Sequence, residues 1–460
     1  MTRLVGIIKG PTLAAAKEQI AQASNDADIL EIRLDLLDSK ALSHLNDLPR
    51  TKPRLFTFRK KSHGGARDLT EQERLEIFEK CLSARPEYCD IETDTDHVFF
   101  ENIAKKYPQM QIIGSLHEFN GIPANLLETF ERMHKPQIAF YKLAIMVQTV
   151  GDALRLMSFA KEHEHLTCIA MGPEGQISRI LSPLIHSDFC YASLEEGDAP
   201  WGQLSLKTLC DVYRFKILSE SAKIFALLGD PVEKSIGPVF HNPSFPKTAV
   251  YVKLHLAIPD LPFFFSIMRK FPFGGFSVTM PLKEQVQKYL TRIDPASAAI
   301  GSVNTILVQD EHMIGYNTDG AGALNALERH GKVEGRHIAI LGAGGSARAI
   351  AYEALQRKAK VTVLNRTLER AQALAKDFGC EGGPLEDFSK TKYDILINTV
   401  PVDLIFDPQS LIESKIVMDI VYWENETPLL KAARERGCIC VNGMEMYKEQ
   451  ALLQQKIWFG

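Results

Sequence analysis

The sequence predicts an α/β protein made of two parts, a (β/α)8 barrel and a two-lobed α/β unit. Three observations support this fold class. Short β-rich runs alternate with helix-like segments eight times within residues 1–218. An α/β segment with polar clusters at its strand ends follows over residues 219–323. A strand, a glycine turn, a helix and a second strand then open a lobe predicted to span residues 324–443, with the last helix, 444–460, returning to the preceding lobe.

Composition excludes several classes of protein. The chain has 460 residues, which is too long for one core, with 24% charged and 45% apolar residues, as in ordinary globular enzymes. A net charge of -4 gives no indication of nucleic acid or a membrane surface as partner. No apolar run approaches the ~18 residues of a membrane span. The eight cysteines lack C-x-x-C spacing, so we expect reduced thiols, no metal site and a cytoplasmic enzyme; the oligomeric state stays open.

The barrel prediction depends on eight strands and the helices between them. The predicted strands are Leu4–Ile8, Ile29–Asp35, Arg54–Arg59, Tyr88–Thr93, Gln111–His117, Ile138–Ile145, Leu166–Met171 and Asp188–Ser193. The predicted helices are Thr12–Ser24, Thr70–Ser83, Val98–Tyr107, Ala124–Met133, Thr149–His163 and Gln176–Leu184. A further helix is expected from Leu204 to Ser221, so the barrel ends near residue 220 with a short, stiff connection.

Charged residues interrupt strands that should be continuously apolar in a buried parallel sheet. The second strand places three charges on one face by its two-residue period, and the next four strands carry polar residues near their ends. These polar residues are Glu31, Arg33, Asp35, Arg59, Asp90, Glu92, His117 and Lys142. For one residue a structural ion pair is as good an explanation. For the set, a catalytic site at the C-terminal end of the barrel is favoured, because uncompensated buried charges are costly.

Lys142 and His117 indicate the chemistry of the barrel. An apolar wall around Lys142 and nearby arginines should lower the lysine pKa, and a neutral amine can attack a carbonyl to form a Schiff base. His117 has an unperturbed pKa suited to proton transfer near neutrality. Arg33, Arg59 and Arg179 suggest a substrate with a carboxylate or phosphate.

Polar clusters mark the α/β segment that follows the barrel. They are residues 229–231, 235–238, 241–242, 276–283, 301–305 and 315–320. The residues 276–283 are expected to join a strand to a helix across Pro281, and the last two clusters to form a hairpin and a loop. Each cluster alone is equally well explained by turn chemistry.

The glycine turn indicates the cofactor. A predicted strand precedes it and a helix follows, with Gly342 at the bend, Gly344 where backbone N–H groups meet a pyrophosphate, and Ala347 at the helix packing position. The whole predicted turn is Gly342, Ala343, Gly344, Gly345 and Ser346. An NAD site carries an acid after the second strand, whereas this chain has Asn365, Arg366 and Thr367, with Arg370 behind. Guanidinium groups there favour a 2′-phosphate, so NADP is predicted.

The barrel resembles type I 3-dehydroquinate dehydratase, a TIM barrel family. The matching segments are Glu31–Arg33, Phe56–Arg59, Asp90–Glu92, Ile112–His117, Lys142, Ile177–Arg179 and Gly202–Gln203. The resemblance implies that Lys142 forms an imine with the C3 ketone of 3-dehydroquinate. It also implies that His117 removes a C2 proton and assists loss of the C1 hydroxyl. The implied substrate-binding residues are Glu31, Arg33, Arg59, Arg179 and Gln203.

Residues 224–460 resemble shikimate dehydrogenase, whose cofactor lobe is a Rossmann fold. The matching segments are Ser277–Lys283, Val303–Thr305, Asn317–Asp319, Gly342–Ala347, Asn365–Thr367, Asp419–Tyr422, Thr427–Pro428, Asn442–Met446 and Gln450–Ala451. The resemblance implies that Lys283 and Asp319 are the catalytic pair, which suits a cation beside a developing alkoxide. The implied substrate-binding residues are Ser235, Thr279, Asn304, Tyr422 and Gln450, and Gly443 joins the NADP-binding residues.

The barrel departs from its family's pattern at three places. His63 stands before Gly64–Gly65, where the family commonly has Glu. Leu116 and Glu118 flank the histidine where the family more often has a polar residue and Asp or Asn. Asp198 or Ala199 replaces an expected serine.

One departure affects the dehydrogenase half. The family usually has serines two apart, and this chain has Ser235 and Gly237, so one carboxylate hydrogen bond is missing. Such a bond contributes roughly 0.5–1.5 kcal/mol, and Lys234 is a candidate to replace it.

The two resemblances together predict a bifunctional enzyme, since the product of the first half is the substrate of the second. Two alternatives stay open. One half has lost its activity and serves as a scaffold, or a different Schiff-base barrel lyase is fused to an NADP dehydrogenase.

Overall fold

The structure is a computed structural model that describes residues 1–195, 197, 202–310, 312–400, 407–422 and 426–460. The chain divides into two compact units. The first contains residues 1–224 and 235–273, and the second contains residues 225–234 and 274–460. Within the described residues, no helix has the length and apolar character needed to cross a membrane.

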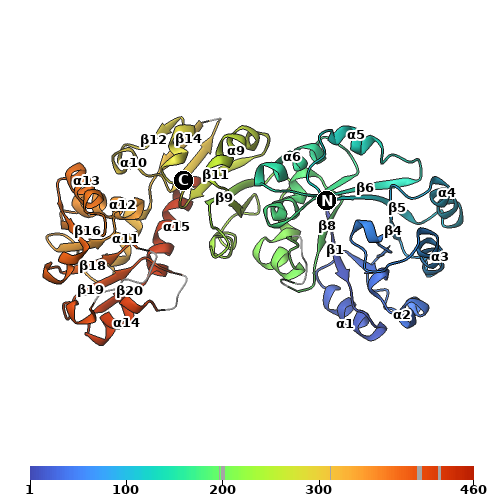
Figure 1. The fold of residues 1–460 in the computed structure, drawn as a ribbon, viewed down its shortest axis with the longest axis horizontal. Coiled ribbons are helices and arrows are strands. Elements are labelled where there is room, and N and C mark those ends of the chain that lie inside the picture. Colours follow the sequence, from blue (N-terminus) through green and yellow to red (C-terminus); the bar gives the residue numbers. More distant parts are fainter. Residues whose placement is uncertain (196, 198–201, 311, 401–406, 423–425) are drawn as a thin grey trace. The chain divides into compact units, whose positions relative to one another are not determined.

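An eight-stranded parallel sheet forms the barrel in the first unit, as Figure 1 shows in blue to green. Its order is β7-β6-β5-β4-β3-β2-β1-β8, and Thr167 of β7 accepts a hydrogen bond from the backbone N–H of Phe189 in β8, so the two ends of this order meet. The strands are β1 (Arg3–Ile8), β2 (Ile29–Arg33), β3 (Arg54–Thr57), β4 (Tyr88–Glu92), β5 (Gln111–Glu118), β6 (Ile138–Met146), β7 (Leu166–Met171) and β8 (Phe189–Ala192). The predicted barrel is confirmed.

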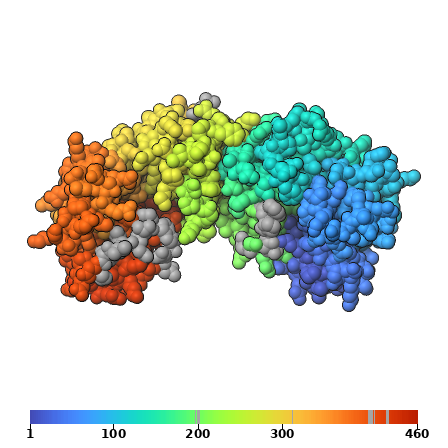
Figure 2. Space-filling model, in the orientation of Figure 1, coloured from blue at the N-terminus to red at the C-terminus, as the bar shows by residue number. Residues whose placement is uncertain are grey.

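Helices lie between the barrel strands and end close to the predicted positions. They are α1 (Leu13–Ala23), α2 (Ser39–Ser43), α3 (Glu71–Leu82), α4 (His97–Lys106), α5 (Leu126–Glu131), α6 (Val150–Lys161) and α7 (Gln176–Ile180). Capping boxes fix the start of two of them, through Thr70 with Glu73 and Thr149 with Asp152. Figure 2 shows one outer face of this part of the chain, in blue to green.

The predicted helix from Leu204 to Ser221 is wrong. The chain forms a π-helical turn at Thr208–Val212 and a 3-10 turn at Phe215–Ile217. Arg214 between them has a φ of 52°, which no continuous right-handed helix contains. Its guanidinium group donates to the carbonyls of Phe245 and Ala249, so long-range side-chain bonds hold the residue at which the helical backbone is interrupted.

The segment between barrel and glycine turn mixes strands and short helices. Its elements are β9 (Lys223–Gly229), α8 (Gly237–His241), β10 (Ala249–His255), α9 (Leu261–Ile267), β11 (Phe273–Val278), β12 (Arg292–Ile293), α10 (Pro295–Ile300), β13 (Thr305–Gln309), β14 (His312–Tyr316) and α11 (Asp319–Glu328). β13 pairs antiparallel with both β11 and β14, which confirms the predicted hairpin. The helix expected after Pro281 is instead a 3-10 turn, Gln285–Tyr289.

A six-stranded parallel sheet forms the lobe around the glycine turn. The order β17-β16-β15-β18-β19-β20 is the one typical of Rossmann folds, which confirms that prediction. Its elements are β15 (His337–Leu341), α12 (Gly345–Gln356), β16 (Lys360–Asn365), α13 (Leu368–Phe378), β17 (Glu381–Pro384), β18 (Ile395–Asn398), β19 (Ile416–Asp419), α14 (Pro428–Glu435) and β20 (Ile439–Val441).

The last helix, α15 (Gly443–Phe459), packs on strands β11 and β13 within the second unit. Gln454 accepts a hydrogen bond from the Ser277 hydroxyl at 2.8 Å, and the Trp458 indole donates to the carbonyl of Ile306 at 3.1 Å. The buried side chains of α15 therefore hold these strands in place.

Candidate active sites

Lys142 lies inside the barrel on β6, and its side chain is buried. Its Nζ donates to Asp90 Oδ2 at 3.0 Å and lies 4.0 Å from the centroid of the Tyr191 ring. The amine therefore has a carboxylate and an aromatic ring as its immediate neighbours. The apolar wall expected from the sequence is therefore only part of this environment.

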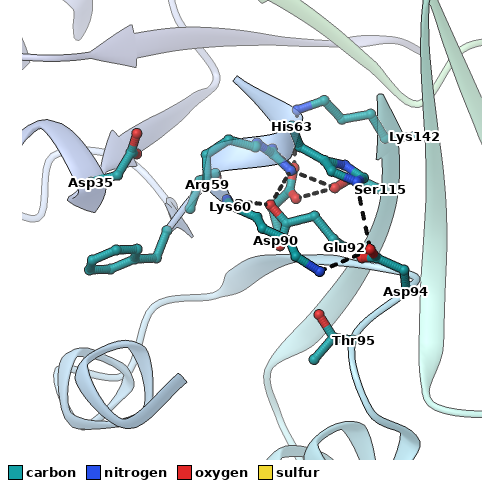
Figure 3. Close-up of polar contacts among 12 residues, drawn as sticks. Asp35, Arg59, Lys60, His63, Asp90, Glu92, Asp94, Thr95, Ser115 and Lys142 are labelled. Carbon is teal, nitrogen blue, oxygen red and sulfur yellow. Dashed lines mark hydrogen bonds and ion pairs between the residues drawn. The ribbon is translucent and has the colours of Figure 1, made fainter. Parts of the chain in front are cut away.

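Asp90, on β4, connects the charged groups around this lysine (Figure 3). It accepts from Arg59 Nη2 at 2.7 Å and from the Ser115 hydroxyl at 2.5 Å. Burial alone would raise the pKa of Asp90, but Arg59 and Lys142 outweigh burial and hold this pKa well below its usual range. Asp90 is therefore a permanent anion between two buried cations.

Arg59, at the end of β3, has both of its terminal nitrogens occupied. Besides Asp90, it donates from Nη1 to Glu92 Oε1 at 3.1 Å and to Ser115 Oγ at 2.7 Å. Glu92 is bound from its other side by Arg74 of α3 at 3.1 Å. Every charge in this group has an opposite neighbour, which offsets the cost of burying it.

His117 lies on β5, two residues after Ser115 and on the same face of the strand. Burial, followed by the positive charges of Arg59 and Lys142, holds the pKa of His117 well below its usual range. The imidazole is thus neutral near neutral pH and able to accept a proton. The His63 ring faces it edge-on, with 5.7 Å between the ring centroids.

The other predicted barrel residues have partners of their own. Glu31 accepts from the Thr57 hydroxyl at 2.7 Å, and Arg33 forms a two-bonded pair with Asp35 at 2.9 Å. Arg179 donates to the carbonyl of Ala170, and burial lowers its pKa to about 10, which leaves it charged at neutral pH. Gln203 is half-buried. Asp198 and Ala199 lie outside the described residues.

Sequence reasoning assigned no role to three residues that contact this group. Ser115 could have been found, because it shares a strand face with His117. Tyr191 lies on an otherwise apolar strand, and Arg74 lies on a helix whose pattern looks exposed, so neither had a sequence signal.

A second charged pair joins Lys283 and Asp319 in the second unit. Asp319 is the first residue of α11, where the helix dipole stabilises a carboxylate. Its Oδ1 accepts from Asn304 Nδ2 at 2.6 Å, and its backbone N–H donates to Asn317 at 3.0 Å. The motifs around residues 283, 304 and 317–319 thus meet in one place.

Further predicted residues surround this pair in the second unit. Thr318 donates to Gln450 at 3.3 Å and also bonds Asn304, which connects α15 to the pair. Ser346 of the glycine turn lies 3.5 Å from both Lys283 Nζ and Asp319 Oδ2. Two other residues predicted to bind substrate, Thr279 and Tyr422, have contacts of their own. The backbone N–H of Thr279 donates to the carbonyl of Leu228. The ring centroids of Tyr422 and Tyr447 are 5.0 Å apart.

Ser235 and Gly237 belong to the first unit. The Ser235 hydroxyl accepts from the backbone N–H of Gly237 at 3.2 Å. A Cβ on Gly237 would lie 2.6 Å from Cε1 of the Tyr251 ring. The tyrosine therefore fills the space that a second serine in this loop would need.

The glycine turn leaves room for a pyrophosphate. Gly342 has a φ of 108°, and a Cβ there would lie 2.4 Å from Thr399 Oγ1, so only glycine makes this bend easily. A Cβ on Gly344 would meet nothing within 4 Å, and the twelve-residue helix α12 starts at the next residue. Open space at a helix N-terminus suits a phosphate.

The residues after β16 also suit the predicted cofactor. Arg366, Thr367 and Arg370 are exposed, and Asn365 donates to the carbonyl of Thr367 at 2.9 Å. No acid stands at the end of this strand. Gly443, which was also predicted to bind NADP, lies against the backbone of the preceding segment. A Cβ there would lie 2.4 Å from the carbonyl oxygens of Ile420 and Val421, so a larger residue would not fit without a shift.

Three family models match consecutive parts of the chain. They are type I 3-dehydroquinase over residues 6–220, the shikimate dehydrogenase substrate binding domain over 227–306, and shikimate / quinate 5-dehydrogenase over 325–418. The chain is also similar to a solved shikimate dehydrogenase in complex with NADP+, at 37% identity and a TM-score of 0.51. That match covers 53% of this chain and 92% of the other.

Curated relatives extend over both halves. The shikimate biosynthesis protein AroDE of Chlamydia pneumoniae is 32% identical over 468 residues, covering 99% of this chain and 95% of its own. The chloroplastic bifunctional 3-dehydroquinate dehydratase/shikimate dehydrogenase of Arabidopsis thaliana is 30% identical, covering 99% and 83%. The shikimate dehydrogenase (NADP(+)) of Pyrococcus furiosus is 40% identical, covering 53% and 93%.

Fold, charged sites and similarities define a fused enzyme, with a lyase barrel followed by an oxidoreductase. The chain belongs to the family of bifunctional shikimate biosynthesis proteins, which join a type I 3-dehydroquinase to a shikimate dehydrogenase. The predicted bifunctional family is confirmed.

Proposed function

We propose that the barrel converts 3-dehydroquinate to 3-dehydroshikimate and that the rest of the chain reduces this product to shikimate with NADPH. The observation that carries the proposal is the presence of two separate built sites. One is the buried lysine with a neutral histidine in the barrel, and the other is the Lys283–Asp319 pair.

The barrel reaction uses Lys142 as nucleophile. Its amine adds to the C3 ketone and water leaves, which gives an imine that withdraws electrons from C2. His117 takes the C2 proton and then donates it to the departing C1 hydroxyl, which leaves as a second water. Water adds back to the imine and frees the lysine, so the net change is the loss of one water.

Asp90 and Arg59 prepare the lysine for this step. Asp90 accepts a hydrogen bond from Lys142 and so fixes the direction of Nζ inside the barrel. Arg59 balances the carboxylate charge. Glu31, Arg33, Arg179 and Gln203 are assigned to the hydroxyls and carboxylate of the substrate, and Arg59 contributes through its charge.

In the second site Lys283 and Asp319 handle the proton. NADPH supplies the hydride when it is bound. The Lys283 ammonium stabilises the oxygen that becomes an alkoxide and donates a proton to it, and Asp319 orients the lysine. Asn304 holds the carboxylate of Asp319 from the other side.

The residues assigned to ligands follow the sequence motifs. Ser235, Thr279, Asn304, Tyr422 and Gln450 are assigned to the substrate. The residues assigned to NADP are Gly342, Ala343, Gly344, Gly345, Ser346, Asn365, Arg366, Thr367, Arg370 and Gly443. The proposal includes three parts of the chain: the barrel over residues 1–218, the substrate lobe over 219–323 and the NADP lobe over 324–443. It also includes a cytoplasmic location, in keeping with eight cysteines that are all free.

Borohydride trapping tests the barrel assignment. Treatment of the wild-type protein with 3-dehydroquinate and borohydride should add one reduced ligand to Lys142, detected by peptide mass spectrometry. The Lys142→Ala protein should take up none. Trapping with sugar phosphates but not with dehydroquinate would support the alternative of an aldolase-like barrel, and an inert wild-type barrel would support the scaffold alternative.

A further inference from the structure

His63 lies at the edge of the barrel site in a position that no assigned role explains. It ends the 3-10 turn Lys61–His63 that follows β3, and only 9% of its side chain is exposed. Its ring faces the ring of His117 edge-on at 5.7 Å between centroids, with an interplanar angle of 66°. Two imidazoles therefore lie side by side next to the lysine site.

Both imidazoles have an unsatisfied nitrogen. Among the described residues, Nδ1 of His63 and Nδ1 of His117 are buried and have no hydrogen-bond partner. Leaving a buried polar atom unpaired costs about 1–3 kcal/mol, so such a pair of atoms indicates a site that operates on protons or ligands.

The other side of His63 leads to the surface. Its Nε2 lies 3.8 Å from Asp94 Oδ2, and the Asp94 side chain is 48% exposed (Figure 3). Asp94 also accepts from Lys60 Nζ at 2.9 Å, which holds the carboxylate in place. His117, His63 and Asp94 thus form a row from the buried lysine site to solvent.

We propose that His63 is a positioning residue that acts through His117, orienting its ring and passing protons between it and Asp94, directly or through one water. This inference deepens the proposed dehydratase function and rests on it. Imine formation requires the Lys142 ammonium to give up a proton and the departing hydroxyl to receive one. His63 accepts a proton while His117 is occupied and returns it, so His63 ends each cycle in its starting state.

The charges around the two rings support this role. Arg59 and Lys142 face His117 and disfavour its cation, while Asp90 favours it. Burial lowers the pKa of His63 first of all, and Arg59 and Lys60 act in the same direction, whereas Asp94 and Glu92 oppose them. Both rings are neutral at neutral pH, and the acidic groups that attract a proton to His63 lie on its side of the row.

Steady-state dehydratase kinetics over a range of pH test the proposal with two variants. His63→Gln keeps a polar side chain, but an amide cannot take up and release a proton as imidazole does. The kcat should therefore fall at least ~10-fold, with KM within about threefold of the wild-type value. His63→Glu places a carboxylate beside His117, which raises the His117 pKa. The acidic limb of kcat/KM should then move up by about one pH unit.

Controls separate this inference from folding and from the proposed function. The dehydrogenase rate of each variant reports its folding, and His97→Gln, at a histidine whose side chain is 74% exposed, should change nothing. Asp94→Asn should lower kcat, with no further loss in the His63→Gln background. Unchanged kcat and pH profiles in both His63 variants, or fully additive losses with Asp94→Asn, would overturn the relay. An inactive wild-type barrel would overturn the proposed function.

Discussion

Asp90 Oδ2 receives both Lys142 Nζ, at 3.0 Å, and Arg59 Nη2, at 2.7 Å, in the interior of the barrel. One carboxylate, on β4, thus compensates two buried cations, Lys142 on β6 and Arg59 just after β3. Asp90 should therefore contribute more to the stability of the protein than a carboxylate with a single, exposed partner does.

Asp90→Asn should therefore destabilise the protein strongly. Removing one partner of a buried ion pair costs about 3–5 kcal/mol, because the Lys142 amine loses its carboxylate partner and Arg59 keeps only Glu92. Urea denaturation followed by circular dichroism would measure the loss. Glu79→Gln breaks an exposed pair with Lys106 and should cost no more than about 1 kcal/mol. Equal effects of the two changes would contradict this account of Asp90.

Asp319→Asn should abolish dehydrogenase turnover and spare dehydratase turnover. The change removes the charge that holds Lys283 while keeping the shape of the side chain, so kcat should fall by at least ~100-fold. Initial rates of NADP+ reduction with shikimate would measure it. A decrease confined to KM would mean that the pair only binds substrate.

Arg366→Glu should weaken NADPH relative to NADH. A charge-assisted hydrogen bond contributes about 1.5–3 kcal/mol, which corresponds to a rise in the KM for NADPH of about 10- to 100-fold. Lys376→Glu makes the same change of charge at an exposed position on α13 and should leave the preference intact. Equal behaviour of both variants would remove the argument for a 2′-phosphate site at Arg366.

Gly237→Ser should destabilise the protein without improving substrate binding. The new Cβ would lie 2.6 Å from the Tyr251 ring, and such overpacking costs about 1–3 kcal/mol. The sequence alone suggested that a serine here would only restore a hydrogen bond. Thermal melting of Gly237→Ser beside Gly237→Ala, which meets the same ring, would test the steric explanation; an unchanged melting temperature in both would contradict it.

His241 should make the stability of the protein depend on pH. It is buried against Tyr251, and burial lowers its pKa to about 3. The unfolded chain, with an ordinary histidine pKa of about 6.5, binds the proton more readily. The contribution is therefore complete above pH ~6.5 and is lost as pH falls toward 3, by about 1.4 kcal/mol per pH unit.

His241→Phe keeps an aromatic ring and should remove this slope. Urea midpoints between pH 4 and 8 would show it as a wild-type midpoint that falls, relative to the midpoint of the variant, as pH decreases. The exposed His97→Gln should keep the wild-type slope. A parallel pH dependence in wild type and His241→Phe would show that His241 does not titrate in this way.

Much of the fold could be predicted because the strands follow simple patterns. The eight barrel strands and the βαβ unit at the glycine turn lie within a few residues of their predicted bounds. The segment around Arg214 could not be predicted, because its backbone is set by carbonyls that lie more than thirty residues away. Local propensity does not include such contacts.

The candidate sites show the same difference. The strand period placed Lys142, His117 and Asp90 on the inside, and the structure brings Lys142 and Asp90 into contact. The burial of Arg74, the ring of Tyr191 under the lysine and the Tyr251 ring beside Gly237 all depend on neighbours from distant elements. A sequence pattern gives the face of a residue but not what lies opposite it.

The most direct test of the bifunctional account is a coupled assay with 3-dehydroquinate and NADPH. Wild-type protein should oxidise NADPH and form shikimate, identified by mass spectrometry. Lys142→Ala and Lys283→Ala should each fail alone, and an equimolar mixture of the two should recover the overall reaction, because each supplies the site that the other lacks. No shikimate from the wild-type chain, or shikimate formation by either variant alone, would contradict the claim that one chain carries both reactions at these two lysines.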